Sequence, residues 1–371
     1  MQMKQRLQIL PLSTWLNGSK PFIIAGPCSI ESEEQILKTA LGLKDKGVSL
    51  IRAGAWKPRS RPGTFEGHGK KALQWLIAAG KEAGLPVATE AGNAQHALQV
   101  IDAGVDVVWI GARTTVNPFL VQEIADAIGD KNIPVLVKNP INPDLQLWMG
   151  AVERLARAGI TKLAAVHRGF SSFESNGYRN KPSWEIPIEL KRQIPDLPLI
   201  CDPSHICGTT DKILPVSQTA LDLNFDGLMI ETHYDPENAL SDADQQVTPD
   251  QLKEILENLV LRTPEVADVL MQNLLEELRE QIDKIDMDLL DVLSKRMEIA
   301  RLIGKYKKDN NITILQPERW AEIVRTRTYN GKIKELTAEF VHKIFEYIHQ
   351  ESIHHQTIVM NEINATLKEK N

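Results

Sequence analysis

Short apolar runs alternate with longer helix-like segments along the first two thirds of the chain. The runs cover residues 22–27, 48–54, 85–90, 107–112, 134–139, 162–168, 197–202 and 227–232. Each is too short for a helix, and most are almost continuously apolar, as strands of a parallel sheet buried on both faces are. Eight such strands, each with a helical segment, predict an α/β fold, a (β/α)8 TIM barrel. An open doubly wound sheet is the alternative, because periodicity alone does not show that a sheet closes.

The distribution of glycine and proline divides the chain. Of 22 glycines, 20 lie before residue 230, and of 20 prolines, 19 lie at or before Pro264. Turn-forming residues separate short elements, and their absence permits long helices. We therefore expect a barrel domain over 1–262, a linker over 263–269 and an all-helical domain over 270–371.

The helical part begins with a long amphipathic pattern. Its apolar residues recur at spacings of three and four, as on one face of a helix: Leu274, Leu278, Ile282, Ile285, Leu289, Val292, Ile299 and Ile303. The pattern predicts a helix over about 268–308, followed by helices over 317–329 and 336–366. A lone helix of that length cannot bury its apolar stripe, so we expect intertwined pairing with a second copy, a homodimer through the helical domain.

Composition and charge exclude several classes of protein. The net charge is −6, from 43 basic and 49 acidic residues, so there is no overall basic field for nucleic acid. No apolar run approaches the roughly 18–20 residues of a membrane helix, and the first residues do not resemble a secretion signal. Three cysteines fit a reducing compartment better than a disulfide framework, so a cytoplasmic location is expected.

Charged side chains follow nearly every predicted strand. In a barrel these positions meet at one end, where active sites form. The cations among them are Arg52, Lys57, Arg59, Arg113, Lys138 and Arg168. So many cations in one barrel mouth would repel one another unless an anion binds, and arginine suits phosphate and carboxylate oxygens. The set predicts one or two phosphorylated small substrates, although each residue alone could be an exposed charge with an acidic neighbour.

A second set at the strand ends combines sulfur, nitrogen and oxygen donors. Cys28, His205, Glu231 and Asp242 would together suit one divalent transition-metal ion. The mixture does not select among Mn, Fe, Co and Zn. Taken singly, the cysteine could be a small core residue and the histidine could cap the turn that follows it.

The barrel motifs resemble those of 3-deoxy-D-arabino-heptulosonate 7-phosphate (DAHP) synthase, type I-beta, over residues 15–262. The motifs are A-G-P-C-S (25–29), R-A-G-A-W-K-P-R-S (52–60), I-G-A-R (110–113), V-K-N (137–139), H-R-G (167–169), C-D-P-S-H (201–205), I-E-T-H (230–233) and A-L-S-D (239–242). The resemblance implies condensation of phosphoenolpyruvate with erythrose 4-phosphate. Related synthases that use arabinose 5-phosphate resemble A-N-R-S where this chain has K-P-R-S at 57–60, which favours the four-carbon sugar.

The same resemblance assigns roles by position. Cys28, His205, Glu231 and Asp242 correspond to the metal ligands. Arg113, Lys138 and Arg168, completed by Arg52 and Lys57, correspond to the phosphoenolpyruvate pocket. Arg59 and Ser60 correspond to the clamp on the phosphate of erythrose 4-phosphate, and Asp202 to a contact with its hydroxyls. No enzyme nucleophile is needed, because the enol carbon attacks, and Lys57 is the candidate proton donor to the new alkoxide.

The helical part resembles the all-helical AroQ class of chorismate mutase over about 270–365. The motifs are L-R-E-Q-I-D-K-I-D (278–286), K-R-M-E-I-A-R-L-I-G-K-Y-K (295–307), Q-P-E-R (316–319) and S-I-H-H-Q (352–356). By position the resemblance implies a chorismate pocket of Arg279, Arg296, Lys307, Arg319, Ser352 and Gln356. Arginines would hold the two carboxylates, with Lys307 and Gln356 at the ether oxygen.

Helix geometry separates these residues. Lys307 follows Arg296 by eleven residues, which returns to the same helix face, whereas Arg279 precedes Arg296 by seventeen and points elsewhere. A partner helix is therefore expected to supply the missing arginine.

Two positions depart from the family pattern and keep an alternative open. Trp320 stands where a carboxylate is common, and Gln316 where an aspartate is common. The leading hypothesis is a bifunctional enzyme, in which prephenate or chorismate bound to the helical domain inhibits the synthase. The alternative is a synthase whose helical domain only regulates or dimerises.

Overall fold

The computed structural model describes residues 7–57, 63–129, 131–173, 177–263 and 268–362. Arg59 and Ser60 lie outside these described residues. The chain divides into two units, Met1–Pro264 and Glu265–Asn371. Each unit is described by itself.

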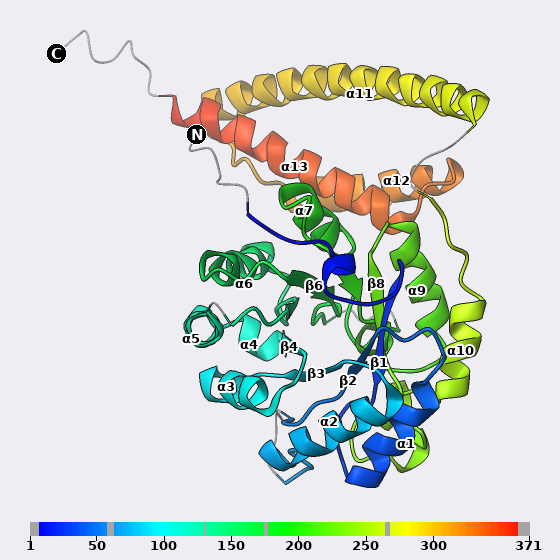
Figure 1. Cartoon of the computed structure of the whole chain (residues 1–371). Coiled ribbons are helices and arrows are strands. Elements are labelled where there is room, and N and C mark those ends of the chain that lie inside the picture. The colour runs from blue at the N-terminus through cyan, green and yellow to red at the C-terminus, as the bar shows by residue number, and fades with distance from the viewer. Residues whose placement is uncertain (1–6, 58–62, 130, 174–176, 264–267, 363–371) are drawn as a thin grey trace, which may run out of the picture. The chain divides into compact units, whose positions relative to one another are not determined.

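Eight parallel strands of the described residues close into a barrel in sequence order, β1 to β8, with β8 pairing back to β1 (Figure 1). The strands are β1 (Phe22–Gly26), β2 (Leu50–Arg52), β3 (Val87–Glu90), β4 (Val107–Ile110), β5 (Val135–Lys138), β6 (Leu163–His167), β7 (Leu199–Cys201) and β8 (Gly227–Glu231). Each lies within a predicted apolar run. The predicted TIM barrel is confirmed, and the open-sheet alternative is wrong.

Two apolar layers explain why the strands are almost continuously hydrophobic. Side chains that point outward, such as Ile23 and Ile51, pack against the surrounding helices. Side chains that point inward, such as Ile24 and Trp109, fill the barrel together with Leu12, from a short 3-10 turn before β1. A strand with both faces buried has no polar alternation to show.

Helices follow the strands and form the outer layer (Figure 1). They are α1 (Glu33–Leu43), α2 (Lys70–Ala83), α3 (Ala94–Ala103), α4 (Ala112–Thr115), α5 (Pro118–Ile128), α6 (Leu145–Arg157), α7 (Glu185–Gln193), α8 (Pro203–Cys207), α9 (Ile213–Asp222) and α10 (Pro249–Glu257). Several begin at a side chain that accepts a hydrogen bond from the first turn, including Ser32, Asn93 and Asp202.

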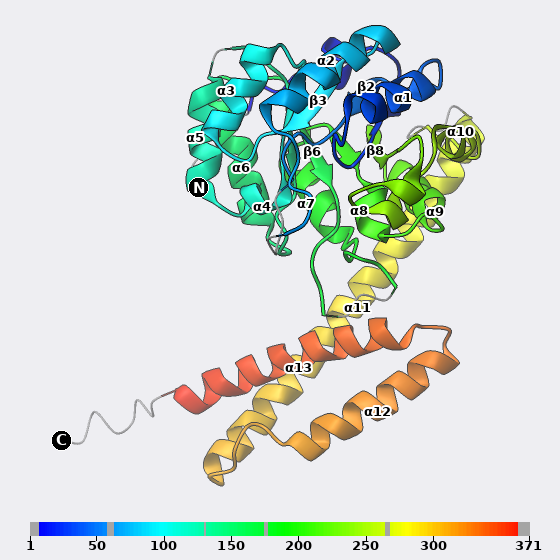
Figure 2. The ribbon, with the colours of Figure 1, turned by 90° about the horizontal axis from the view of Figure 1, so that it is seen from below.

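The second unit consists of three helices, α11 (Val269–Asp309), α12 (Pro317–Ile333) and α13 (Ala338–Asn361), shown in Figure 2. Helix α13 packs against both α11 and α12. Gly304 allows the close crossing of α11 and α13, because a Cβ there would lie 3.0 Å from the Cα of Gln356. No helix among the described residues has the length and hydropathy needed to cross a membrane.

Helix α11 exposes its apolar stripe. Every residue from Asp268 to Val292 is exposed, including Leu278, Ile282 and Ile285. Only the second half of α11 buries side chains, among them Met297 and Ala300. The described residues of this unit therefore leave half of a 41-residue helix without an apolar partner.

Candidate active sites

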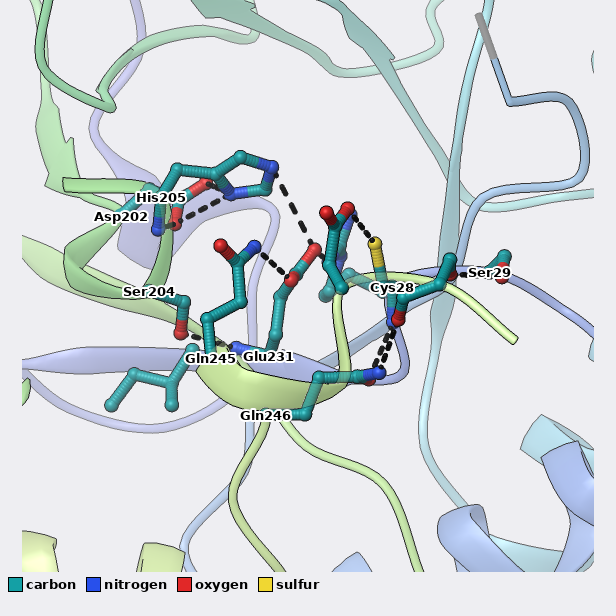
Figure 3. Close-up of polar contacts among 12 residues, drawn as sticks. Cys28, Ser29, Asp202, Ser204, His205, Glu231, Gln245 and Gln246 are labelled. Carbon is teal, nitrogen blue, oxygen red and sulfur yellow. Dashed lines mark hydrogen bonds and ion pairs between the residues drawn. The ribbon is translucent and has the colours of Figure 1, made fainter. Parts of the chain in front are cut away.

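The four predicted metal-ligating side chains lie together at the carboxyl end of the barrel. Cys28 follows β1, Glu231 ends β8 and Asp242 lies in the loop after it; their ligand atoms are all within 4.8 Å of one another. His205, on α8, has its Nε2 atom 3.8 Å from Oε1 of Glu231. Figure 3 shows the side chains of Cys28, His205 and Glu231 pointing toward one another. A thiol, an imidazole and two carboxylates at this spacing fit a divalent transition-metal ion.

The backbone around this cluster is tightly built. Gly26 ends β1, and a Cβ on it would lie 2.2 Å from the carbonyl oxygen of Arg52. Its φ of +146° is one that a side chain would disfavour. Asp242 itself has a left-handed backbone, with φ 49°. The two loops that carry Cys28 and Asp242 are joined by a 2.6 Å hydrogen bond between the hydroxyls of Ser29 and Ser241.

His205 is oriented by Asp202. Its Nδ1 atom lies 2.8 Å from the carboxylate of Asp202, so with Nδ1–H donating, the Nε2 lone pair faces Glu231. Burial lowers the pKa of His205, which keeps the imidazole neutral. A carboxylate that fixes the tautomer of a histidine in this way is common behind metal-binding imidazoles.

Asp202 is fully buried, and its oxygens are engaged within the chain. They accept hydrogen bonds from Lys138, at 2.8 Å, and from the ring and the backbone amide of His205. Burial acts against the charge, but His205 and Lys138 hold the pKa of Asp202 well below its usual value.

Two cations of the predicted phosphoenolpyruvate pocket lie beside the donor cluster. Arg52 pairs with Glu231 in the barrel interior. Burial opposes ionisation of Glu231, yet the positive charges of Arg52 and Lys57 beside it hold its pKa at about 2. Lys57 contacts the sulfur of Cys28 and lies 3.2 Å from Asp242. Burial acts against the ammonium charge, but the surrounding groups, with Cys28 first, raise the pKa of Lys57 so that it stays protonated.

A cavity of about 390 Å³ opens next to this cluster, and cations dominate its lining. Lys57, Arg113, Lys138 and Arg168 all line it, as the sequence predicts, together with Glu90 and Asp242. Burial lowers the pKa of Arg168 to about 10, although the charge of Asp202 opposes the shift. A buried guanidinium near two other arginines is stabilised by a bound anion.

Trp109, a residue of the barrel core, packs against charged side chains at the cavity. The ring of Trp109 lies under Arg52, with the guanidinium carbon 4.8 Å from its centre, and under Lys138, at 5.9 Å. The indole N–H of Trp109 donates a 2.9 Å hydrogen bond to Glu90.

Several residues of the site are absent from the sequence-based prediction. Asn180 accepts a 2.6 Å hydrogen bond from Arg168 and donates one of 2.6 Å to the carbonyl of His205. Arg179 contacts Asp242 at 3.1 Å and also donates to the side chain of Gln245. Gln245 in turn donates a 2.5 Å hydrogen bond to Glu231 (Figure 3). Glu90 ends a predicted strand and so belongs to the charged residues expected at the strand ends, whereas Arg179 and Asn180 lie in an irregular loop and Gln245 in a short 3-10 helix.

The helical unit brings three of its six predicted residues, Arg296, Ser352 and Gln356, into one hydrogen-bonded group, while Lys307 is buried on the same helix as Arg296 and donates to the carbonyl of Ile314. Arg296 donates to the hydroxyl of Ser352 and, at 3.4 Å, to the carbonyl of Ile348. Lys307, Ser352 and Gln356 are buried, and Gln356 donates to the carbonyl of Ser352 at 3.3 Å.

The other two predicted residues of this unit are exposed. Arg279 pairs with Glu276, and Arg319 pairs with Glu322. Because α11 is one continuous helix, Arg279 lies about 25 Å along it from Arg296. This chain does not bring Arg279 to the pocket of Arg296.

Comparison with known proteins gives two matches along the chain. The DAHP synthetase I family matches residues 14–266, and the chorismate mutase type II family matches residues 278–357. The chain belongs to the DAHP synthetase I family. Its DAHP synthase domain is followed by a helical domain that matches the chorismate mutase type II family, and the two matches together support a bifunctional enzyme of the shikimate pathway. The resemblance inferred from the motifs is confirmed for both parts.

Individual relatives agree with this family. The phospho-2-dehydro-3-deoxyheptonate aldolase of Thermotoga maritima is 35% identical over 237 residues, which cover 64% of this chain and 68% of the relative. Its crystal structure, a DAHP synthase, superposes with a TM-score of 0.57 at 34% identity, over 65% of this chain and 68% of that one. A 2-dehydro-3-deoxyphosphooctonate aldolase of Legionella pneumophila is 31% identical over 258 residues, covering 64% of this chain and 90% of the relative.

Proposed function

We propose that the DAHP synthase domain condenses phosphoenolpyruvate with erythrose 4-phosphate to give DAHP and phosphate. The observation that carries this proposal is the cation-lined cavity directly beside the donor cluster of Cys28, His205, Glu231 and Asp242. One region offers charge for the phosphate and carboxylate of phosphoenolpyruvate, and the neighbouring region offers ligands for a metal.

The donor cluster would hold one divalent ion: Mn²⁺, Fe²⁺, Co²⁺ or Zn²⁺. When bound, such an ion supplies Lewis-acid polarisation of the aldehyde oxygen of the sugar phosphate. The fit rests on the mixed donor set, on its spacing and on the Nε2 lone pair of His205 that Asp202 turns toward Glu231.

The side chains of this chain would divide the remaining work. Arg113, Lys138 and Arg168 hold the anionic groups of phosphoenolpyruvate, with Arg52 and Lys57 at the inner edge. The enol carbon attacks the aldehyde carbon, and protonated Lys57 gives its proton to the alkoxide that forms. Water then adds to the former enol carbon, and phosphate leaves it. Arg59 and Ser60 are the candidates for the sugar's phosphate. Asp202, predicted to contact the sugar's hydroxyls, is fully buried and bonds Lys138 and His205, so we propose that it positions these two side chains instead.

The test measures both activities of the full chain before and after chelation. Chelator is expected to abolish DAHP formation, and added Mn²⁺ or Co²⁺ to restore it, while chorismate rearrangement in the same sample continues. DAHP formation that persists after the metal content has fallen to zero would contradict the proposal. Arabinose 5-phosphate replacing erythrose 4-phosphate at equal rate would instead contradict the choice of sugar.

We propose that the helical unit rearranges chorismate to prephenate. Arg296, Lys307, Ser352 and Gln356 form a cationic, partly buried group that suits a dicarboxylate, and no nucleophile is required. Arg319 lies on the exposed first turn of α12, where a ligand could draw it from Glu322.

We further propose that a second copy of the chain completes this pocket. Arg279 lies on the half of α11 whose apolar stripe is exposed, and an antiparallel or crossed partner helix would cover the stripe and deliver the arginine. The occupant of the stripe is therefore another α11.

A regulatory helical domain without turnover is the second candidate. It is favoured by Trp320, an aromatic residue at a position where the mutase family commonly has a carboxylate. A chorismate-to-prephenate assay on the full chain, with Arg296→Ala as the inactive control, separates the two candidates.

Feedback is the last part of the proposal: prephenate or chorismate bound in the helical pocket inhibits DAHP formation. Such inhibition requires different affinities for two states of the whole chain. The expected result is lower DAHP formation at saturating prephenate in the unmodified chain and not in Arg296→Ala. Equal inhibition of both proteins would locate the inhibitor elsewhere.

A further inference from the structure

Two aromatic rings from different helices stack at the edge of the proposed mutase pocket. The indole of Trp320, on α12, and the imidazole of His349, on α13, have centroids 4.3 Å apart and planes 11° from parallel. Both residues are half-buried. The Nε2 atom of His349 is fully enclosed and has no hydrogen-bond partner among the described residues.

The face of α13 that carries His349 is the face that forms the pocket. His349, Ser352 and Gln356 follow one another at spacings of three and four, so they share one side of the helix. Ser352 bonds Arg296 on α11, and Gln356 packs against Gly304 of the same helix. Burial, and then the charges of Arg296 and Lys307, lower the pKa of His349, so its imidazole is neutral and near both cations.

An enclosed nitrogen without a partner destabilises a folded protein, so it calls for an explanation, and a ligand that supplies the missing hydrogen bond is one. The charged groups that act on His349, Arg296 and Lys307, are both hydrogen-bond donors. Ser352 already accepts from Arg296 and donates to the carbonyl of Ile348 at 2.6 Å.

Chorismate needs one acceptor in such a pocket. Its two carboxylates and its ether oxygen accept hydrogen bonds, and its ring hydroxyl is its one donor. A neutral imidazole has one nitrogen that can accept. Trp320 cannot accept this hydrogen bond, because its indole N–H is only a donor. Its stacking on His349 instead fixes the plane of the imidazole.

We propose that His349 is a substrate-binding residue of the mutase site, accepting a hydrogen bond at Nε2 from the ring hydroxyl of chorismate, and that Trp320 is the positioning residue that holds the imidazole in place. This inference rests on the proposed mutase function. It assigns to His349 a contact that no motif of the sequence indicates.

The test compares two substrates in the full chain: chorismate and an analogue that lacks the ring hydroxyl. His349→Leu is expected to lower kcat/KM for chorismate about tenfold, the worth of one hydrogen bond, and to leave kcat/KM for the analogue unchanged. His349→Gln, which restores an acceptor, should recover most of the loss. Trp320→Leu should lower discrimination between the two substrates without removing it.

His354→Leu is the matched control, because His354 is an exposed histidine of the same helix. The thermal unfolding of each variant and its DAHP synthase activity report whether the chain is intact. An equal loss of kcat/KM with both substrates would make His349 a structural residue. No loss with either substrate would indicate that Gln356 accepts the hydrogen bond from the ring hydroxyl, because its Oε1 atom also has no partner among the described residues. Either result overturns the inference alone. An unmodified chain that neither binds nor rearranges chorismate would overturn the mutase function and, with it, the inference.

Discussion

His167 shows how far a single buried side chain departs from its solution behaviour. It ends β6 inside a cluster of aromatic rings, with Trp184 at 5.2 Å and Phe170 at 5.7 Å between centroids. Burial lowers the pKa of His167 to about 3, so the imidazole is neutral in the folded chain. The unfolded chain binds a proton near pH 6.5, and the folded chain does not.

This difference predicts acid sensitivity. Because the folded pKa lies below the unfolded one, His167 contributes no penalty above pH 6.5 and an increasing one as the pH falls toward 3. Between pH 7.5 and 5.0 the barrel should lose about 2 kcal/mol of stability from this residue alone, at 1.36 kcal/mol for each pH unit below 6.5.

The measurement is the denaturant midpoint of the barrel transition at the two pH values. His167→Phe keeps an aromatic ring in the cluster and should reduce the pH dependence by that amount. The exposed His354→Phe serves as the control and should not change it. An unaltered pH dependence in His167→Phe would mean that the imidazole is protonated in the fold.

At the scale of elements, the loop after β6 connects two parts of the synthase site. Asn180 joins Arg168, which lines the cavity, to the backbone of His205 on α8. Gly169 permits this approach: its φ is +75°, and a Cβ there would lie 2.7 Å from the carbonyl oxygen of Asn180. The buried amide of Asn180 therefore links the anion pocket to the donor cluster, in addition to the carboxylate of Asp202.

Two substitutions at Asn180 separate its contacts. Asn180→Ala removes both hydrogen bonds and should raise KM for phosphoenolpyruvate and weaken metal binding, each roughly tenfold. Asn180→Asp keeps the acceptor for Arg168 and loses the donor to His205, so metal affinity should fall while KM for phosphoenolpyruvate changes little.

Metal titration and initial rates measure these two effects. Asn238→Ala, at an exposed amide of the loop after β8, is the control and should alter neither. If both Asn180 variants shift KM and metal affinity in parallel, the amide does not act through two separate bonds.

The sequence predicts helices and strands better than it predicts the side-chain contacts between them. Eight apolar runs identify eight strands because each run is local, and a closed parallel sheet then brings residues such as Arg52 and Lys138 to one end. The contacts from Asn180 to His205 and from Arg179 to Asp242 span 25 and 63 residues and start in an irregular loop. Hydrophobic periodicity does not predict contacts of this kind, so they are found only in the structure. The stack of Trp320 on His349 belongs to the same class.

At the scale of the whole molecule, the exposed stripe of α11 is the surface through which we propose that two copies of the chain pair. Ile285→Lys places a charge in the stripe and should convert a dimer to a monomer. Rearrangement of chorismate should then fall at least tenfold, because Arg279 no longer reaches the partner's pocket. Sedimentation velocity and the mutase assay measure the two effects.

The control for this prediction lies on the acidic side of the same helix. Asp291→Lys changes charge by two units at an exposed position away from the stripe, and should leave both the assembly and the mutase activity intact. A monomeric Ile285→Lys with full mutase activity would show that one chain forms a complete pocket.

The position of Trp109 has a consequence for how this synthase can diverge. This core side chain contacts Arg52 and Lys138 with the face of its ring and donates a hydrogen bond to Glu90. Charged residues of three strands therefore depend on a ring that is also part of the barrel interior. Replacing Trp109 would therefore disturb both the packing of the barrel and the catalytic site. New substrate preferences in descendants of this enzyme are therefore expected to arise by changes in the loops around the rim, while the tryptophan is inherited unchanged.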